Sequence, residues 1–204
     1  MEFRFDDLTK IPDEPAVRML ARKSSKLQAQ PGLPASASLP EMLQALLEQE
    51  ALFDMLHMLA VALPPREAVW WACLAARDLV GHDNRQPPQP LAAAERWVFK
   101  PDARNREAAR QAMELADIDD DTVFCAMAAV YADGTMGEGE LAQAEAPPNA
   151  VPAAVFGMNM KSVSGLTDAD EKHVETLIAR ALDIARGGNG RLDSAALEDT
   201  KGEM

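Results

Sequence analysis

Two adjacent tryptophans, Trp70 and Trp71, constrain this chain more than any other feature of its sequence. They lie in a stretch from residue 68 to 80 that is rich in alanine and contains no turn residue. Successive residues on a helix point about 100° apart, so neighbouring indoles cannot share one narrow apolar stripe. A helix that is apolar over so wide an arc packs on several sides. The segment therefore predicts the central helix of an all-helical domain.

The composition agrees with a helical fold. Hydrophobic residues make up 48% of the 204 residues but aromatic residues only 5%, so alanine, leucine and methionine must fill most of the core. These residue types favour helix over strand. We expect an all-α fold of about seven helices in an orthogonal or αα-hairpin array around the Trp-Trp helix.

Apolar periodicity and proline or glycine boundaries predict where the helices lie. They are expected over residues 41–63, 65–80, 91–99, 102–116, 122–132, 151–160 and 167–187. Asp102 is an expected N-cap, and residues 167–170 form a capping-box pattern. Arg106 falls on the predicted solvent side of its helix.

The domain organisation is expected to have three parts. Residues 1–38 form an N-terminal segment and linker, in which residues 15–22 could form a short helix. Residues 39–187 form the helical domain. Residues 188–204 are polar and aperiodic, which predicts a disordered tail.

The net charge argues against two classes of partner. With 33 acidic and 20 basic residues the formal charge is −13, and such a chain repels both the phosphate backbone that dominates nucleic-acid affinity and anionic membranes. No stretch is long enough for a membrane span, and the first residues lack the pattern of a signal peptide. We therefore expect a cytoplasmic protein whose partner is another protein.

The two cysteines, Cys73 and Cys125, both lie in apolar helical contexts. Buried free thiols are the favoured interpretation, because free cysteine behaves as a small hydrophobic residue. A disulfide between them is the alternative.

No familiar catalytic or cofactor motif is present: no P-loop, no dinucleotide-binding glycine pattern, no nucleophile elbow and no zinc-protease helix. The run Asp117, Asp119 and Asp121 resembles a calcium loop, but Thr122 and Ala128 stand where that loop needs glycine and glutamate. A solvated acidic cluster at a helix start is favoured instead. The chain is predicted to be non-enzymatic, with no cofactor and no metal.

The histidines leave a narrow enzymatic alternative. His57 lies among apolar helical neighbours and is expected to be a partly buried structural residue. If a site of unrecognised type exists, its candidates are His82 with Asp83, or His173 with Glu171.

The tryptophans are expected to belong mainly to the core, with Trp71 and Trp97 largely buried. The alternative for Trp70 is an anchor in a protein-binding groove, where tryptophan is enriched. Arg77 follows Trp70 by seven residues and shares its helix face, so it needs an acidic partner or an open rim. Trp70 and Arg77 are the candidate protein-binding residues.

Several segments together resemble a known family. They are the stretch 65–77 around the tryptophan pair, residues 93–98 with Lys100 and Pro101, residues 105–109, and the glycine and proline stretches at 134–136 and 147–148. Over about residues 40–160 the chain is similar to an uncharacterised family of small bacterial proteins encoded beside type VI secretion genes. That resemblance implies a helical fold and a genomic setting, without known site residues. The chain is also similar to immunity proteins of polymorphic toxin systems, which alternate alanine-rich helices with arginine and tryptophan.

These observations predict an accessory protein, an adaptor or chaperone, of a type VI secretion system that acts by protein–protein binding. The first alternative is an immunity protein that neutralises a toxin, since an acidic inhibitor suits a basic toxin. The second is an enzyme with an unrecognised site.

Overall fold

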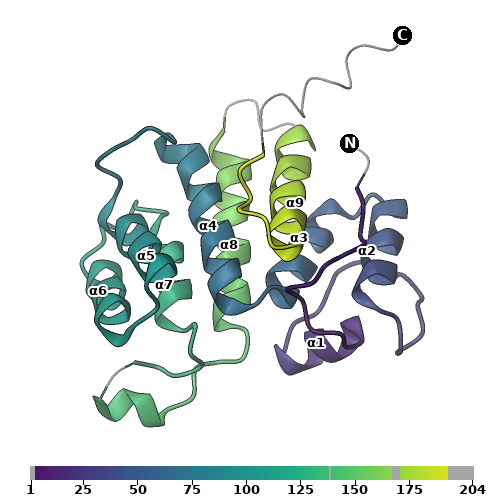
Figure 1. Cartoon of the computed structure of the whole chain (residues 1–204), viewed down its shortest axis with the longest axis horizontal. Coiled ribbons are helices and arrows are strands. Elements are labelled where there is room, and N and C mark those ends of the chain that lie inside the picture. The colour runs from purple at the N-terminus through teal and green to yellow at the C-terminus, as the bar shows by residue number, and fades with distance from the viewer. Residues whose placement is uncertain (1–2, 138, 167–170, 193–204) are drawn as a thin grey trace.

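The computed structural model describes residues 3–137, 139–166 and 171–192, and within them the fold is all-α, with nine α-helices and no strand (Figure 1). The predicted fold class is confirmed. The helices are α1 (Ala16–Arg22), α2 (Leu39–Glu48), α3 (Leu52–Ala62), α4 (Pro65–Val80), α5 (Gln89–Phe99), α6 (Ala103–Glu114), α7 (Val123–Val130), α8 (Ala150–Gly165) and α9 (Glu171–Ala185).

The single helix predicted over residues 41–63 is wrong, because the chain forms two helices there, α2 and α3. Ser38 and Glu41 form a capping box at the start of α2, in which the Ser38 backbone N–H donates to Glu41 Oε2 at 2.7 Å. Between the helices Glu50 takes a φ of +55°, a left-handed conformation incompatible with a helix interior. A helix over residues 15–22 was only a possibility in the sequence, and the structure contains it as α1. This helix and the break at Glu50 together raise the number of helices above the seven expected.

Helices α4 and α8 run side by side through the centre of the molecule (Figure 1). On one side of them lie α5, α6 and α7, and on the other lie α9, α3, α2 and α1. Helix α4 begins at Pro65 and ends before Gly81, which has a φ of +91°. Proline suits a first helical turn and glycine the positive φ of a helix end. The predicted central helix is therefore confirmed, with its bounds.

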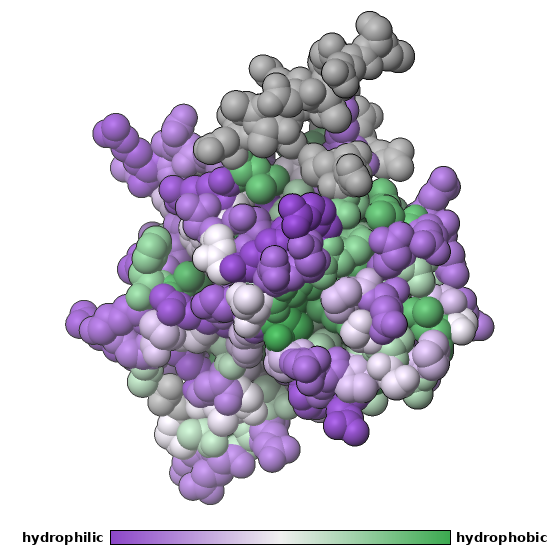
Figure 2. Space-filling model, turned by 45° about the vertical axis from the view of Figure 1, so that its right-hand side comes forward, coloured by the Kyte–Doolittle hydropathy of each residue, from purple (hydrophilic) through white to green (hydrophobic). Residues whose placement is uncertain are grey.

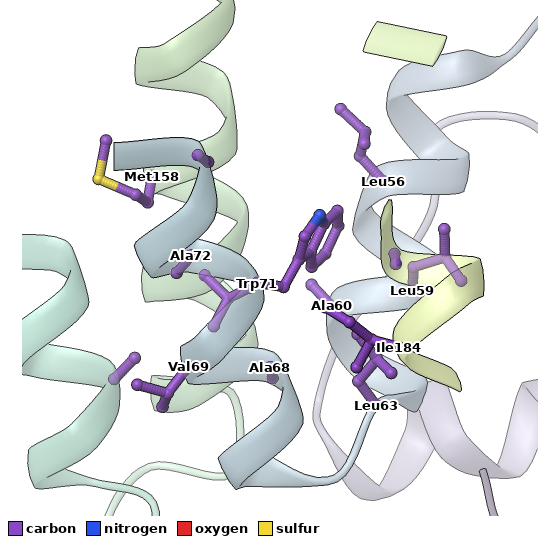
Figure 3. Packing of buried hydrophobic residues seen from close by; sticks show 14 of the residues in the cluster. Leu56, Leu59, Ala60, Leu63, Ala68, Val69, Trp71, Ala72, Met158 and Ile184 are labelled. Carbon is purple, nitrogen blue, oxygen red and sulfur yellow. The ribbon is translucent and has the colours of Figure 1, made fainter. Parts of the chain in front are cut away.

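Trp71 is the central side chain of the core. It is fully buried, and Figure 3 shows its ring pointing from α4 toward Leu56 and Ala60 of α3. Its Nε1–H donates a hydrogen bond to the carbonyl oxygen of Leu177 in α9 at 3.0 Å. Trp97 is also buried. Both tryptophans expected in the interior lie there.

The chain before α1 packs against the end of α9. Phe3 and Phe5 are buried in the core cluster. The backbone N–H of Lys10 donates to the carbonyl oxygen of Ala185 at 2.9 Å, and Arg186 donates from Nε to the carbonyl oxygen of Asp6 at 3.2 Å. The described part of the N-terminal segment therefore lies on the helical body.

The linker between α1 and α2 is held by a buried carboxylate. Asp54 of α3 accepts hydrogen bonds from the backbone N–H groups of Gln28, at 2.9 Å, and Ala29, at 2.7 Å. Two such bonds satisfy a carboxylate that would otherwise be costly to bury. Met19 of α1 adds apolar contact, because it is almost completely buried.

Arg106 is buried, contrary to its predicted place on the solvent side of α6. Its guanidinium donates to the carbonyl oxygens of Val130, at 2.6 Å, and Thr135, at 2.9 Å, and it pairs with Asp133. These acceptors replace the hydrogen bonds to water that the guanidinium loses when it is buried. It thereby fixes the glycine-rich loop after α7.

Other local predictions have mixed outcomes. The Asp102 side chain accepts from the Asn105 backbone N–H at 2.9 Å, so it is the N-cap of α6 as predicted. Helix α8 extends to Gly165, beyond the predicted end at Met160. The capping-box pattern at 167–170 and residues 193–204 of the predicted tail lie outside the described residues. Residues 188–192, where that tail was predicted to begin, are described, and hydrogen bonds with Trp70 and Asp183 hold them on the helical body.

In the view of Figure 2, a hydrophobic band near the middle of one face is bordered by hydrophilic residues. The large apolar residues with the most exposed surface are Val17, Phe53, Phe99, Leu115, Ile118 and Leu141. Within the ranges that the structure covers, no helix combines the length and apolar character needed to cross a bilayer.

Candidate functional site

Trp70 lies half-buried on α4, and contacts from two other parts of the chain hold its ring. Its Nε1–H donates to the carbonyl oxygen of Asn189 at 2.7 Å. The centroid of its ring lies 6.1 Å from that of Phe99, at the end of α5, with the planes tilted by 60°. The guanidinium carbon of Arg191 lies 5.7 Å from the indole centroid, a cation–π distance. Because Trp70 is already oriented, a partner that contacts it loses little entropy in ordering it.

A groove of about 400 Å³ opens beside Trp70, between the start of α4, the end of α5 and the turn after α9. We call it the Trp70 groove, and it is lined by Lys10, Arg66, Glu67, Trp70, Val98, Phe99, Ile184, Gly187, Gly188, Asn189 and Arg191. The ring of Phe99 projects into solvent, with 74% of the residue exposed. The volume lies in the lower part of the range for ligand sites. The groove is thus sized for a short segment of a partner.

One wall of the groove is the turn after α9, and Gly190 allows it to close on the core. Gly190 has a φ of +71°, and a Cβ there would lie 2.7 Å from Leu74 Cδ1 and 2.8 Å from Ile184 Cδ1. Its N–H donates to Asp183 Oδ2 at 2.8 Å. Glycine accepts this conformation and this close approach because it has no Cβ. The turn therefore presents the Asn189 carbonyl to Trp70.

The groove carries a local excess of positive charge. Lys10 is paired with Glu67 at 3.3 Å. Arg66 donates from Nε to the Val98 carbonyl oxygen at 2.7 Å, and Arg191 lies against Trp70, but within the described ranges neither guanidinium has a carboxylate partner. In a chain whose formal charge is −13, two unneutralised arginines beside two aromatic rings are a distinctive combination.

Arg77, the other predicted protein-binding residue, already has an acidic partner. Its Nε and Nη2 donate to the two carboxylate oxygens of Glu95 at 2.7 and 2.6 Å, and its Nη1 donates to the Asn84 carbonyl oxygen at 2.8 Å. The bond to Glu95 raises the pKa of Arg77. Arg77 lines a second hollow, of about 700 Å³, that Trp70 and Phe99 also line. The structure therefore brings both candidates to one surface, with Arg77 engaged by its own chain.

Asp78 gathers a polar cluster next to this hollow. Arg180 of α9 donates to its two carboxylate oxygens at 2.5 and 3.0 Å, and His82 Nε2 lies 2.8 Å from Asp78 Oδ1. His173 Nε2 lies 2.7 Å from Ser162 Oγ and 3.8 Å from Asp78 Oδ2. In a catalytic serine–histidine–aspartate relay the hydroxyl and the carboxylate contact different ring nitrogens. Here both approach Nε2, and Ser162 is fully buried, so the cluster joins α4, α8 and α9 structurally.

Of the two histidine pairs named from the sequence, only that of His82 with Asp83 falls wholly on described side chains, and this pair does not form. His82 contacts Asp78 rather than Asp83. Burial lowers the pKa of His173, and Arg180 lowers it further, while Asp78 acts in the opposite direction. The side chain of Glu171, its expected partner, lies outside the described part of the structure.

His57 is half-buried and stacks on Phe156 with ring centroids 5.0 Å apart. Burial lowers the pKa of His57. This agrees with the structural role expected for it.

Both cysteines are free and buried, as favoured from the sequence. Burial and the neighbouring thiol of Cys125 raise the pKa of Cys73 well above its usual value, so Cys73 remains a thiol and a poor nucleophile. Across the described ranges, no three His, Cys, Asp or Glu side chains are placed to hold a metal ion.

Apart from the Trp70 groove and the hollow beside Arg77, a larger groove of about 930 Å³ lies between α5, α6 and the loop that leads to α7. Its rim is the acidic face, residues 115–121, where Leu115 and Ile118 are almost wholly exposed. Asp120 accepts from the Thr122 backbone N–H at 2.9 Å, which agrees with the predicted helix-start cluster. Asp121 pairs with Lys161 at 2.9 Å.

The fold and these surfaces define an all-helical protein with two apolar grooves of different charge. The chain belongs to a family of unknown function (DUF6931), whose family model matches residues 42–185. The match runs from within α2 to the end of α9 and includes Arg66, Trp70 and Phe99, while Arg191 follows it. Comparison with curated proteins and with solved structures found no match.

Sequence reasoning named Trp70 and missed its partners Arg66, Phe99 and Arg191. One signal for Arg66 was available. It follows Pro65 in the first turn of α4, where the positive end of the helix dipole disfavours a cation. A basic residue in that place suggests a role other than helix stability. No comparable sequence signal identified Phe99 or Arg191.

Proposed function

We propose that this chain is a non-enzymatic accessory protein, an adaptor or chaperone, of a bacterial type VI secretion system. It acts in the cytoplasm by binding a secreted or structural component through the Trp70 groove. The observation that carries the binding role is the pair of rings in that groove, Trp70 held in place and Phe99 left open. The secretion setting rests on the resemblance of the double-tryptophan segment.

Three properties of the groove support a protein partner. Tryptophan and arginine are the residues that most often dominate binding energy in protein interfaces. The indole orientation is fixed by the Asn189 carbonyl before binding. The volume of about 400 Å³ suits a short segment of a partner. The overall negative charge also disfavours nucleic acid and anionic membranes as alternatives.

The test is a pull-down from the native host with the tagged wild-type chain and two variants. Phe99→Ser alters the Trp70 groove, whereas Leu115→Ser alters an equally exposed apolar residue on the acidic face and serves as the matched control. A secretion component should co-purify with the wild type and the control, and about tenfold less with Phe99→Ser. Recovery of no secretion component, or equal recovery with both variants, would contradict the proposal.

The acidic face supports a second candidate, an immunity protein that neutralises a basic toxin. Exposed Leu115 and Ile118 lie among four aspartates, which complements an apolar and cationic surface. Complementary charge accelerates encounter and suppresses wrong partners.

Gene order separates these two functions. A toxin gene immediately upstream favours immunity, whereas sheath and baseplate genes favour the adaptor. In the pull-down, an immunity protein would lose its partner with Leu115→Ser and keep it with Phe99→Ser.

A further inference from the structure

We propose that the Trp70 groove binds a partner segment that presents a carboxylate beside a bulky apolar side chain. This inference rests on the proposed function, because it names the chemistry of the partner for the same groove. It follows from the side chains that line the groove and from the charges left without a partner there.

The apolar half of the site is formed by two rings and two aliphatic side chains. Phe99 lies 6.1 Å from Trp70 between ring centroids and exposes three quarters of its surface. Val98 and Ile184 line the same groove. Covering Phe99 with an apolar side chain removes both from water, which is the main source of binding energy in interfaces.

The half of the site that receives the carboxylate is formed by Arg66 and Arg191. The Nε of Arg66 is used by the Val98 carbonyl at 2.7 Å, which fixes the side chain and leaves its terminal N–H groups available. Arg191 stacks on Trp70, and such stacking leaves the edge of a guanidinium free to donate. A guanidinium edge matches the two oxygens of a carboxylate.

The other cations around Trp70 do not compete for this role. Lys10 is paired with Glu67, Arg77 is held by Glu95 and Arg180 by Asp78. The groove therefore concentrates its unused positive charge in two side chains, both beside the rings. This placement favours an acidic and apolar partner over a basic one.

A polyanion such as single-stranded nucleic acid would also use arginine and stacked rings. The formal charge of −13 opposes it, since every phosphate outside the groove meets an acidic surface. A peptide that places one or two carboxylates in the groove avoids that repulsion.

The test is selection of a phage-displayed random dodecapeptide library against the full chain. We expect enrichment of peptides in which Asp or Glu lies close to Leu, Met, Phe or Trp. The best peptide, labelled with a fluorophore, is then titrated against the wild type and variants by fluorescence anisotropy.

Variants that remove or reverse the positive charge decide whether the arginines are responsible. Arg191→Glu should weaken binding about tenfold, and Arg66→Gln by a similar factor, since each removes a charge-assisted hydrogen bond. Arg96→Glu is the matched control, because Arg96 is an exposed arginine on α5 that lines the other groove. Unchanged thermal melting of Arg191→Glu shows that a loss of binding is not a loss of fold.

Several outcomes would overturn the inference. These are no enrichment, enrichment of peptides without acidic residues, equal weakening by Arg96→Glu, or displacement of the peptide by oligo-dT at equal concentration. Failure here is distinguishable from failure of the proposed function. A pull-down that recovers no secretion component leaves the peptide preference intact, and a failed selection leaves the pull-down result intact.

Discussion

Two neighbouring rows of residues on α4 have the same spacing and different roles. Trp71 and Asp78 both reach α9, where they contact the Leu177 carbonyl and the Arg180 guanidinium. Trp70 and Arg77, each one residue earlier, border the surface hollows instead. One residue along a helix rotates the side chain by about 100°. The comparison teaches that the tryptophan pair combines a core residue and a groove residue.

We call Trp71 and Asp78 the core row, and Trp70 and Arg77 the groove row. The difference predicts that changes in the core row alter stability, whereas changes in the groove row alter binding. The largest expected effect is that of Trp71→Ala. Loss of a fully buried indole should lower the free energy of unfolding by about 3–5 kcal/mol. Trp70→Ala, the matched change one residue away, should cost about 1 kcal/mol because the ring is half-buried. Urea unfolding followed by circular dichroism measures both, and equal losses would break the comparison.

Asp78→Asn tests the second member of the core row. It weakens the two bonds that Arg180 donates and leaves that guanidinium short of a charged acceptor. We expect a loss of about 2 kcal/mol in the free energy of unfolding. Asp119→Asn, on the acidic face, is the control and should stay within about 0.5 kcal/mol. The assignment of Asp78 to a stabilising cluster fails if the two variants unfold alike.

Gly190→Ala tests the same comparison at the wall of the Trp70 groove. The positive φ and the close approach to Leu74 and Ile184 should cost about 1 kcal/mol. The turn that presents the Asn189 carbonyl to Trp70 should shift as well, so affinity for a selected peptide should fall more than stability. Gly187→Ala, also at positive φ but with open space around its Cβ, is the control. Unchanged peptide affinity in Gly190→Ala would show that this turn does not shape the groove.

A smaller effect is expected with pH. Burial lowers the pKa of His57 and of His173, so the folded chain takes up protons less readily than the unfolded chain. Their contribution to stability is therefore complete above the ordinary histidine pKa of about 6.5 and is lost as the pH falls below it. Urea midpoints should decrease from about pH 7.5 to about pH 5.5, and less steeply in His173→Gln. An equal slope in that variant would exclude His173 as a contributor.

Phe99→Ser should have the smallest effect on stability and a clear effect on binding. Its ring is mostly in solvent, so unfolding should change by less than about 0.5 kcal/mol. Thermal melting and the pull-down described above measure the two properties on one preparation. A large drop in melting temperature would show instead that Phe99 contributes to the core.

The predictable part of the fold came from local signals. Pro65 and Gly81 bound α4 in the sequence as they do in the structure, because their backbone preferences act within one turn. The break at Glu50 carried no such signal, since neither proline nor glycine is present there. Its left-handed conformation occurs where α2 and α3 pack against each other, which is a tertiary feature.

The site was predictable only where it depends on a single helix. Trp70 follows from the helical geometry of α4. Its partners Phe99 and Arg191 come from the end of α5 and from the turn after α9, about 30 and 120 residues away. Their proximity depends on tertiary packing, which hydrophobic periodicity does not describe. Arg106 was misplaced for the same reason, since its acceptors lie at the end of α7 and in the loop that follows it.

The N-terminal segment is held to the end of α9 by the hydrogen bond from Lys10 to Ala185, and Phe3 and Phe5 belong to the same core cluster. This contact constrains the order of folding during synthesis. Residues 3–11 leave the ribosome long before α9. The two phenylalanines therefore stay exposed to solvent until α9, against which this segment packs, has been synthesised. Packing of the N-terminal segment is thus a late step in folding. A stalled chain that lacks α9 would expose these two phenylalanines, which are typical binding sites for chaperones.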